Sequence, residues 1–353
     1  MSDKLKFGIV GAGRIAQAYA EAFETCGTAR LVAVADVQPD AAHALAGRAG
    51  CQSYDSYAAL SDAVVLDAVV VCTPPATHRE VAMHFLSRGI HVLCEKPLCV
   101  RRESAVRMIE SARENGVLLT MASKFRFVED VERARQLVLS GTVGEVVLVE
   151  NAFTSHVDMR GRWNSDPAVS GGGVLIDNGT HSLDLMRHLL GPLAFVQIAE
   201  GRRSQGLEVE ETVRVSVRSS DGVMGSIDLS WSIDKELPWF LQIYGSEGTI
   251  SVGWKESSYR LAGGGERTTF GGGYDKVKAF GGQLDNFARA IRGEEALVVT
   301  PEDALASVEC VEAAYAALKA DRWTAVEPTL FAGPPATAFA RGGEIVTEAE
   351  GIA

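Results

Sequence analysis

A glycine-rich turn near the start of the chain constrains its fold more than any other segment. Residues 11–16 read G-A-G-R-I-A and connect an apolar, strand-like run to a helical stretch. Gly11 permits a tight turn, Gly13 lets a pyrophosphate approach the backbone closely, and Ala16 keeps the helix near the strand. The segment therefore predicts a dinucleotide-binding βα unit whose helix N-terminus binds the phosphates. The cofactor-binding residues predicted here are Gly11, Gly13, Arg14 and Ile15.

Asp36 comes at the end of the second strand-like run, 20 residues after Ala16. A carboxylate at this position accepts a hydrogen bond from the ribose 2′-hydroxyl and repels a 2′-phosphate. The next residues, Val37, Gln38 and Pro39, supply no cation for such a phosphate. The sequence therefore predicts NAD in preference to NADP, and a purely structural capping role for Asp36 is the alternative.

Short apolar runs alternate with helical stretches over the first third of the chain. Strand followed by helix, repeated in this way, is typical of a parallel, doubly wound sheet. We predict an α/β fold class with an N-terminal Rossmann domain at residues 1–123. The strand candidates are residues 5–10, 31–35, 68–72, 91–94 and 117–122, with helical segments such as 77–87 and 101–115 between them.

After about residue 145 the pattern changes to longer, β-branched runs separated by hairpin signals. This predicts a C-terminal α+β domain, residues 124–328, with an open and mostly antiparallel sheet. Two helices end the domain, at 280–292 and 301–320, and we expect that they can pack back on the first domain. Residues 329–353, rich in Gly, Ala, Pro and Thr, are predicted to form a loosely ordered tail. The strand candidates are residues 145–154, 195–200, 212–217, 223–232, 239–244 and 248–252.

Two turns follow successive strand candidates and should lie at the carboxyl edge of the first sheet. One turn is at residues 73–78. The other is Glu95-Lys96-Pro97, in which Pro97 stiffens the backbone so that the Lys96 ammonium is held in one direction. Open α/β sheets bind ligands at this edge, although a surface loop lysine is the alternative. The residues predicted beside the cofactor from these turns are Thr73, Pro74, His78, Glu95 and Lys96.

Ionisable groups lie along one face of a predicted helix at residues 171–190. Asp177, His181, Asp184 and His188 follow i, i+4, i+7, i+11 spacing, whereas apolar residues occupy another face. A carboxylate and an imidazole there indicate proton chemistry, and the surrounding glycines indicate that something approaches the backbone closely. A capping aspartate with a packed core histidine is the alternative. Asp and His one turn apart can also chelate a metal, but no Cys or third His is near, so no metal site is predicted.

Composition restricts the class of partner. A chain of 353 residues, 46% hydrophobic, fits two domains. Its net charge of −12 argues against nucleic acid or an anionic membrane and favours a small substrate, because phosphate binding needs a concentrated positive surface. Six cysteines without metal spacing, and no signal-like or membrane-spanning apolar stretch, predict a cytoplasmic protein.

Four motifs in this order resemble the Gfo/Idh/MocA oxidoreductases: G-A-G-R-I-A at Gly11, C-T-P-P-A-T-H at Cys72, E-K-P at Glu95, and G-G-G-V-L-I-D-N-G-T-H-S-L-D at Gly171. The resemblance runs from about residue 5 to 327. It implies a nicotinamide cofactor at the seam of two domains, assembly through the open sheet into homodimers or homotetramers, and catalytic roles for Lys96, Asp177 and His181. Many members carry Asn or Gln two residues before an Arg, where this chain has Lys124 before Arg126.

The predicted function is reversible oxidation of a secondary alcohol on a sugar, nucleotide sugar or cyclitol, with NAD as the cofactor. A non-catalytic NAD-binding sensor of a sugar pathway and an NAD-dependent glycosidase are the alternatives. The residues predicted to bind the substrate are Lys124, Arg126, Arg160, Arg162, Trp163, Asp177 and His181.

Overall fold

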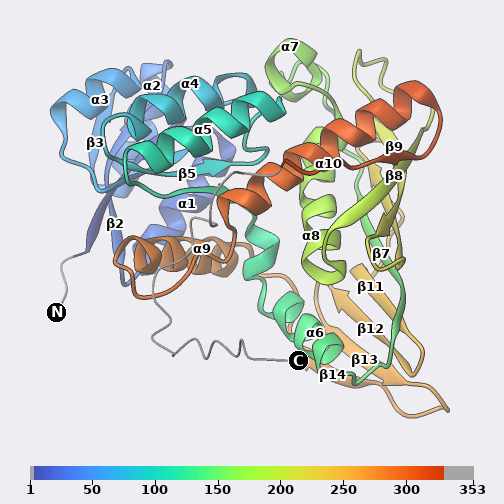
Figure 1. Cartoon of the computed structure of the whole chain (residues 1–353). Coiled ribbons are helices and arrows are strands. Elements are labelled where there is room, and N and C mark those ends of the chain that lie inside the picture. Colours follow the sequence, from blue (N-terminus) through green and yellow to red (C-terminus); the bar gives the residue numbers. More distant parts are fainter. Residues whose placement is uncertain (1–3, 330–353) are drawn as a thin grey trace, which may run out of the picture.

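The computed structural model describes residues 4–329 and contains two sheets side by side, joined by helices that cross between them (Figure 1). The first is a six-stranded sheet in the order β3-β2-β1-β4-β5-β6, and all its pairs are parallel. Its strands are β1 (Leu5–Val10), β2 (Ala29–Ala35), β3 (Gln52–Tyr54), β4 (Ala68–Val71), β5 (His91–Glu95) and β6 (Leu119–Ala122). The connecting helices are α1 (Arg14–Thr25), α2 (Pro39–Ala49), α3 (Tyr57–Ala63), α4 (Pro75–Leu86) and α5 (Arg102–Glu114). The predicted α/β fold class is confirmed.

Burial on both faces explains the composition of this sheet. Every residue of β4 and β6 is buried, as expected for parallel strands that helices cover on either side. The C-terminal half of the chain returns to complete one face: α9 (Lys276–Ile291) packs against α1. Its Phe280 ring lies 4.6 Å from that of Tyr19, and its Phe287 ring lies 6.0 Å from that of Phe7.

The second sheet has nine strands in the order β14-β13-β12-β11-β7-β10-β9-β8-β15. All pairs are antiparallel except β7 with β10, which run parallel, so the sheet is mixed but mostly antiparallel, as predicted. The long strands are β7 (Val146–Thr154), β8 (Leu193–Glu200), β9 (Thr212–Ser219), β10 (Met224–Ser230), β11 (Trp239–Gly245) and β12 (Gly248–Gly253). Three strands of this sheet were not among those predicted: the edge strands β14 (Thr268–Gly271) and β15 (Thr324–Ala325), and β13 (Ser257–Leu261) next to β14.

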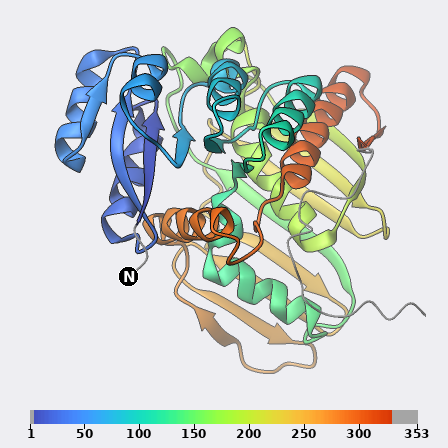
Figure 2. The same ribbon diagram turned by 60° about the vertical axis from the view of Figure 1, so that its left-hand side comes forward.

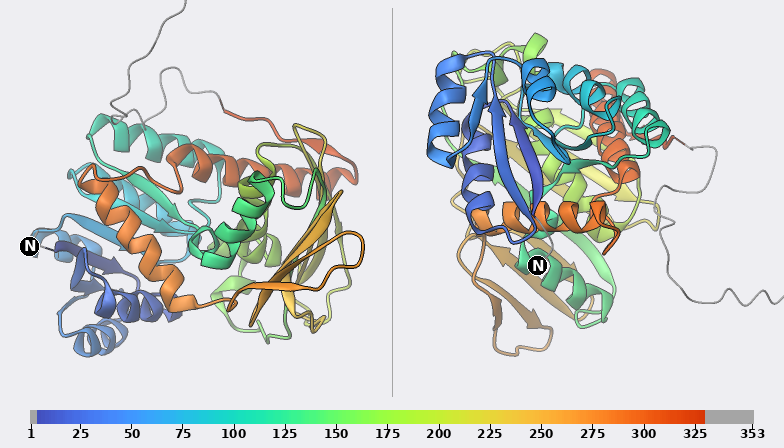
Figure 3. Two further views of the ribbon diagram at one scale, coloured as in Figure 1. Left: turned by 90° about the horizontal axis from the view of Figure 1, so that it is seen from below. Right: turned by 90° about the vertical axis from the view of Figure 1, so that its left-hand side faces the viewer.

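Helices cover only one face of the second sheet. They are α6 (Glu129–Leu139), α8 (Thr180–Leu190) and α10 (Pro301–Ala320), and the opposite face carries no helix in the part of the chain that the structure describes (Figures 1 and 3). Two short segments join them to the first domain, the 3-10 turn η1 (Lys124–Phe127) and the helix α7 (Pro167–Ser170). Figure 2 shows α9 lying across the base of the first domain while α6 packs on the second sheet.

Two further sequence predictions concern a membrane-spanning segment and a C-terminal tail. Among residues 4–329 no helix is long and apolar enough to cross a membrane. The predicted tail lies, from residue 330 onward, outside the described residues.

Candidate active site

The turns after β1, β4 and β5 meet at the carboxyl edge of the first sheet. Gly11 has φ of +95°, and a side chain there would lie 2.6 Å from the carbonyl oxygen of Cys72, so only glycine fits. Gly13 caps α1 without a side-chain hydrogen bond, and open space surrounds its Cα. The first N–H groups of α1 therefore have room for an anion, which fits the pyrophosphate of a dinucleotide.

Asp36 directly follows β2 and contacts the glycine turn. Its Oδ2 accepts a hydrogen bond from Ala12 N at 2.6 Å, and its Oδ1 accepts one from Gln38 N at 2.8 Å. Each carboxylate oxygen has a further lone pair. Asp36 can thus brace the turn and still accept a hydrogen bond from a ribose hydroxyl.

Two adjoining cavities open where this edge faces the second domain. The larger, of about 660 Å³, includes Gly13, Arg14, Ile15 and Thr73 from the first domain and Arg162 and Trp163 from the second. The smaller, of about 360 Å³, lies toward the second sheet. Six residues line both cavities: Ile15, Glu95, Lys96, Ser155, Asp177 and Asn178.

Lys96, Asp177 and His181 all line the smaller cavity. The peptide bond between Lys96 and Pro97 is cis. Lys96 Nζ donates to Asp177 Oδ1 at 2.5 Å and to the Asp177 carbonyl oxygen at 3.0 Å, which holds the ammonium in place. The two side chains come from opposite domains, so this ion pair bridges the seam.

His181 is 8% exposed, and its ring stands edge-on to that of Phe125, with 5.1 Å between centroids. Burial, with the neighbouring charges of Lys96 and Lys124, holds the pKa of His181 well below its usual value. The imidazole is therefore neutral near pH 7 and can accept a proton. Its Nδ1 is enclosed and has no protein partner among the described residues, whereas Nε2 is the more open nitrogen.

The helix that carries these groups begins with an irregular turn. Residues Leu175–Gly179 form a π-helical turn, η3, which continues directly into α8. Such turns occur often at functional sites. The buried Glu210 carboxylate holds this start, because its Oε1 accepts from Gly173 N at 2.9 Å, Leu175 N at 3.1 Å and Tyr315 Oη at 2.8 Å.

The glycines before η3 leave room for protein groups rather than for a ligand. A Cβ on Gly172 would overlap the Tyr315 hydroxyl, and one on Gly173 would overlap the backbone of Glu210. The close approach that the sequence indicated therefore comes from α10 and from the segment before β9.

Aromatic rings form the wall of the smaller cavity opposite Lys96, and the sequence did not predict them. Phe125 stacks on Phe153 at 4.8 Å and on Tyr274 at 5.3 Å, and Trp254 lies 5.8 Å from Tyr274. Each ring comes from a different segment of the chain, so no short sequence motif predicts that the rings lie together. Asn178 was also missed, although its position next to Asp177 in the D-N-G-T-H motif was a usable signal.

Arg126 is not brought to the cavities, contrary to the predicted substrate contact. Its side chain is 5% exposed, and its guanidinium pairs with Asp184 at 2.6 Å and with Asp303 at 3.0 Å. Ser123 donates a short hydrogen bond to the same Asp184. The ionisable helix face therefore divides: Asp177 and His181 line the cavity, whereas Asp184 and His188 do not.

Three further predicted residues have other surroundings. Arg160 is 69% exposed, pairs with Asp158 at 2.9 Å and lines neither cavity, although the adjacent Arg162 and Trp163 do. The buried His78 ring bonds the carbonyl oxygens of Pro97 and Thr73, so it joins the two turns instead of facing the cofactor cavity. Pro74 precedes α4, and Pro75, not Pro74, lines the larger cavity.

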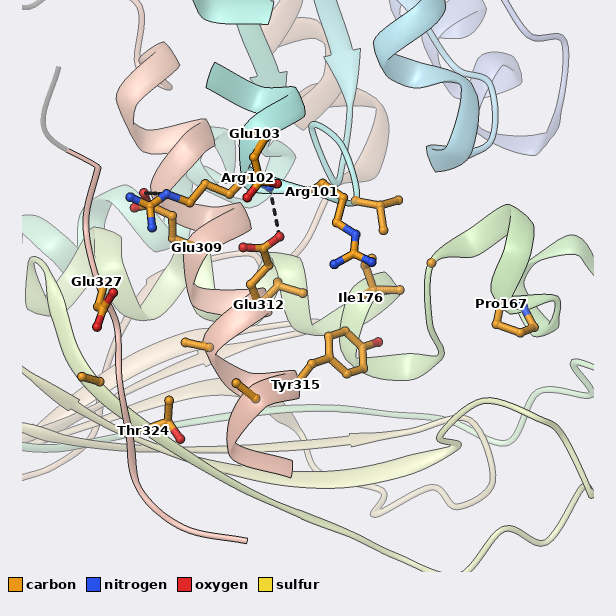
Figure 4. Close-up of a pocket in the computed structure, with 16 residues that line it drawn as sticks. Arg101, Arg102, Glu103, Pro167, Ile176, Glu309, Glu312, Tyr315, Thr324 and Glu327 are labelled. Atoms are coloured by element: carbon orange, nitrogen blue, oxygen red, sulfur yellow. Dashed lines mark hydrogen bonds and ion pairs between the residues drawn. The ribbon is translucent and has the colours of Figure 1, made fainter. Parts of the chain in front are cut away.

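A third cavity, of about 690 Å³, lies between α5, α7 and α10, on the far side of η3 (Figure 4). Arg102 donates through its backbone N–H to Glu312 at 3.0 Å, and its guanidinium lies 3.4 Å from Glu309. Figure 4 shows the Tyr315 ring turned toward Ile176 of η3. These charged groups are paired within the protein, and the cavity adjoins η3 through Ile176 without opening to Lys96 or His181.

Comparison with known proteins gives the same result for both domains. Residues 5–123 match the family described as "Oxidoreductase family, NAD-binding Rossmann fold", and residues 131–251 match the "GFO/IDH/MocA C-terminal domain". The chain is 28% identical to rhizopine catabolism protein MocA of Rhizobium meliloti, over 90% of this chain and 96% of that one. It is 30% identical to D-glucoside 3-dehydrogenase of Escherichia coli K12, over 74% of this chain and 72% of that one.

Solved structures share the fold over almost the whole chain. Levoglucosan dehydrogenase, in a complex with NADH and levoglucosan, superposes with a TM-score of 0.83 at 20% identity, covering 92% of this chain and all of that one. GenD2 from gentamicin A biosynthesis, in a complex with NAD, superposes with a TM-score of 0.79 at 26% identity, covering 93% of this chain and 97% of that one. The chain belongs to the Gfo/Idh/MocA family of oxidoreductases, whose first domain is an NAD-binding Rossmann fold.

Proposed function

We propose that the protein is an NAD-dependent dehydrogenase that reversibly converts a secondary alcohol on a sugar or cyclitol into a ketone. The observation that carries this proposal is the meeting of Lys96 and His181 in one cavity that shares its walls with the glycine-turn cavity. A sensor of NAD or sugar has no need of an ammonium and a neutral imidazole at that point.

His181 acts as the base in the direction of oxidation. Its neutral ring takes the hydroxyl proton at Nε2, the more open nitrogen, as the C–H bond of the same carbon breaks. A bound nicotinamide would supply the acceptor for the hydride that leaves this carbon. Loss of the proton and the hydride converts the alcohol into a ketone, and the reverse reaction adds both back to the carbonyl group.

Lys96 stabilises the charge that develops on the alcohol oxygen. Its ammonium has three N–H donors, of which Asp177 takes two through its carboxylate and carbonyl oxygens. The third is free to donate to the substrate. Asp177 thus positions Lys96 and offsets its charge, so that an ammonium is tolerated beside the positive nicotinamide ring.

Residues at the edge of the first sheet support NAD as the cofactor. Gly13, Arg14 and Ile15 would lie along the pyrophosphate and nicotinamide ribose, with Thr73 and Glu95 on the other side. We propose a preference over NADP because Asp36 occupies the end of β2, where it would repel a 2′-phosphate. Arg162 and Trp163 are proposed substrate contacts from the second domain.

The substrate class rests on the relatives. Among them are an inositol 2-dehydrogenase of Rhizobium meliloti, 28% identical, and the D-glucoside dehydrogenase described above. We also propose assembly into a homodimer or homotetramer through the uncovered face of the second sheet (Figure 3). All six cysteines are free thiols, which fits a reducing, cytoplasmic location.

A panel of inositols, aldoses, uronates, glycosides and nucleotide sugars, assayed with NAD and then NADP, tests the proposal. We expect NADH to accumulate in step with the ketone product, and faster than NADPH. Release of an aglycone without net NADH would instead assign an NAD-dependent glycosidase. Cofactor and sugar binding without turnover of any compound, in either direction, would assign a sensor.

A further inference from the structure

Lys124 brings to the smaller cavity an ammonium group that no carboxylate of the described residues pairs with directly. It lies in η1, three residues before the end of that turn, and it lines the cavity with Lys96 and His181. Its ammonium makes no hydrogen bond or ion pair to any residue between positions 4 and 329. Glu95 and Asp177 are the nearby acids, but both have other partners. Glu95 accepts from the Tyr19 hydroxyl at 2.9 Å and the Lys96 amide at 3.2 Å, and Asp177 pairs with the Lys96 ammonium.

Aromatic rings surround this ammonium in place of a counter-ion. Lys124 Nζ lies 5.3 Å from the centroid of Phe125, 5.6 Å from that of Phe280 and 5.8 Å from that of Tyr274. Cation–π attraction offsets only part of the cost of removing a cation from water. An anion that enters the cavity could therefore form an ion pair with the Lys124 ammonium, which no protein group forms directly.

Tyr274 supplies a second unpaired donor beside the first. Tyr274 lines the same cavity, and its hydroxyl oxygen is buried and has no hydrogen-bond partner within the described residues. Native proteins rarely leave buried polar atoms without a partner. An ammonium and a phenol that both lack partners, on one wall, indicate a ligand with oxygen acceptors.

Resting on the proposed function, we propose that Lys124 and Tyr274 together bind a carboxylate of the substrate, so that the oxidised alcohol belongs to a sugar acid or a similar polyhydroxy acid. Lys96 and His181 bind the reacting hydroxyl at the cofactor side, and the carboxylate lies away from it, against the aromatic wall. Phe153 and Trp254 then pack on the C–H face of the ring.

The size and donors of the cavity favour a small carboxylate over a phosphate or a nucleotide sugar. A phosphate site collects several cations or backbone N–H groups, whereas this wall offers one ammonium and one phenol. The cavity of about 360 Å³ lies at the small end of ligand sites, which span roughly 300–1,000 Å³. A monosaccharide acid fits both limits.

Matched substrates test the inference on the complete protein with saturating NAD. D-glucuronate and D-galacturonate are each compared with their uronamides, which differ only in lacking the charge. We expect kcat/KM for an acid to exceed that for its amide by roughly 10²-fold. Lys124→Met should abolish this ratio by lowering only the value for the acid, Lys124→Arg should retain most of it, and Tyr274→Phe should reduce it several-fold.

Lys276→Met is the matched control, because Lys276 is exposed, lies near Lys124 and lines neither cavity. It should leave the acid-to-amide ratio unchanged. An equal kcat/KM for acid and amide in the wild type, or an equal loss for both in Lys124→Met, would overturn the carboxylate site.

Calorimetric binding of the same four compounds to the NADH complex supplies a readout without turnover. We expect the acids to bind at least tenfold more tightly than the amides, and Lys124→Met to remove the difference. Turnover of neutral sugars only would overturn the carboxylate site and leave the dehydrogenase intact. Absence of turnover with tight, Lys124-dependent acid binding would overturn the dehydrogenase and leave the site.

Discussion

At the scale of single residues, the candidate site depends on two side chains whose environments differ. Lys96 is held by two hydrogen bonds that its ammonium donates to Asp177, whereas His181 is kept neutral by burial and by neighbouring ammonium groups. One group is fixed to carry charge and the other to receive a proton. This division is what transfer of a proton away from an alcohol requires.

Replacing Lys96 with Met or His181 with Ala should each reduce kcat by roughly 10²–10⁴-fold, since each removes one group that acts in the transition state. Neither residue contacts the glycine turn, so the Kd for NADH, measured by fluorescence titration, should change little. Phe127→Leu, in η1 but outside both cavities, is the control. Near-normal kcat in either variant would refute that residue's role.

Local chemistry in the sequence identified Lys96, Asp177 and His181, because each lies in a motif whose spacing alone brings it to a sheet edge or a helix face. Arg126 was assigned to the same cavity and lies elsewhere. The sequence does not distinguish a buried arginine from one at the mouth of a cavity. Here Arg126 pairs with Asp303, which is 177 positions away and could not be identified from a local pattern. The aromatic wall was missed for the same reason.

Arg126→Met should lower the free energy of unfolding by about 3–5 kcal/mol, because it leaves the fully buried Asp184 carboxylate without its cation. Arg160→Met removes a matched but exposed pair with Asp158 and should leave stability unchanged. Chemical denaturation of both variants measures the difference. Equal stability of the two would mean that the buried pair contributes nothing.

At the scale of elements, the start of the helix that carries Asp177 and His181 is held by contacts from other parts of the chain. Glu210 and Tyr315 hold the residues before and within η3, and no Cβ fits at Gly173. The orientation of Asp177 and His181 therefore depends on the segment before β9 and on α10 as well as on their own helix. Burial raises the pKa of Glu210, because the carboxylate is removed from water. The fold must therefore supply all three hydrogen-bond donors to this group.

Gly173→Ala should destabilise the protein and lower kcat, because the new methyl group would displace the Glu210 backbone and shift η3. Gly281→Ala is the matched change in the middle of α9, where no atom lies within 4 Å of an added Cβ, and it should stabilise by about 0.5–1 kcal/mol. Thermal unfolding and kcat of the two variants report the contrast. A stable, fully active Gly173→Ala protein would contradict this account of the helix start.

The elements that sequence reasoning located are those with strong apolar periodicity, such as β4, β5 and α10. It missed β3, β13, β14 and β15, which are short or rich in polar and glycine residues and lie at or next to sheet edges. Such strands are fixed by pairing with a neighbour and bury few side chains of their own. The π turn was missed because it results from packing against α10.

At the scale of the whole molecule, the site exists only where the two domains meet. The chain crosses between them through η1 and returns through α9 and α10, so that each domain is completed by segments far apart in sequence. Sequence patterns predicted both sheets and the helices α9 and α10, but not how the two domains pack together at their interface. Closure depends on shape and on ion pairs between distant residues, which no local pattern encodes.

Stability should fall as the pH is lowered from 7.5 to 5.5. Burial lowers the pKa of His78, His91, His181 and His188, the last to about 4, below the value of about 6.5 in an unfolded chain. The unfolded state therefore binds protons first, and stability is full above about pH 6.5 and is lost below it. The raised pKa of Glu95 and of Glu210 opposes this trend, because these buried carboxyl groups bind protons in the folded state before they do so in the unfolded chain.

Urea denaturation at a series of pH values checks this prediction. We expect the midpoint to be constant near neutrality and to decrease progressively below pH 6.5. A midpoint that stays constant or rises down to pH 5.5 would mean that these histidines are not enclosed as neutral rings.

Transfer of deuterium from the substrate to NAD tests the central claim most directly, because it follows the hydrogen that the site is arranged to remove. A sugar or cyclitol from the panel, labelled at the carbon of the reacting alcohol, is incubated with NAD and the protein, and the nucleotide is analysed by mass spectrometry. We expect one deuterium in each NADH, with equimolar ketone. Label that remains on the sugar or passes to water, while product forms, would contradict it.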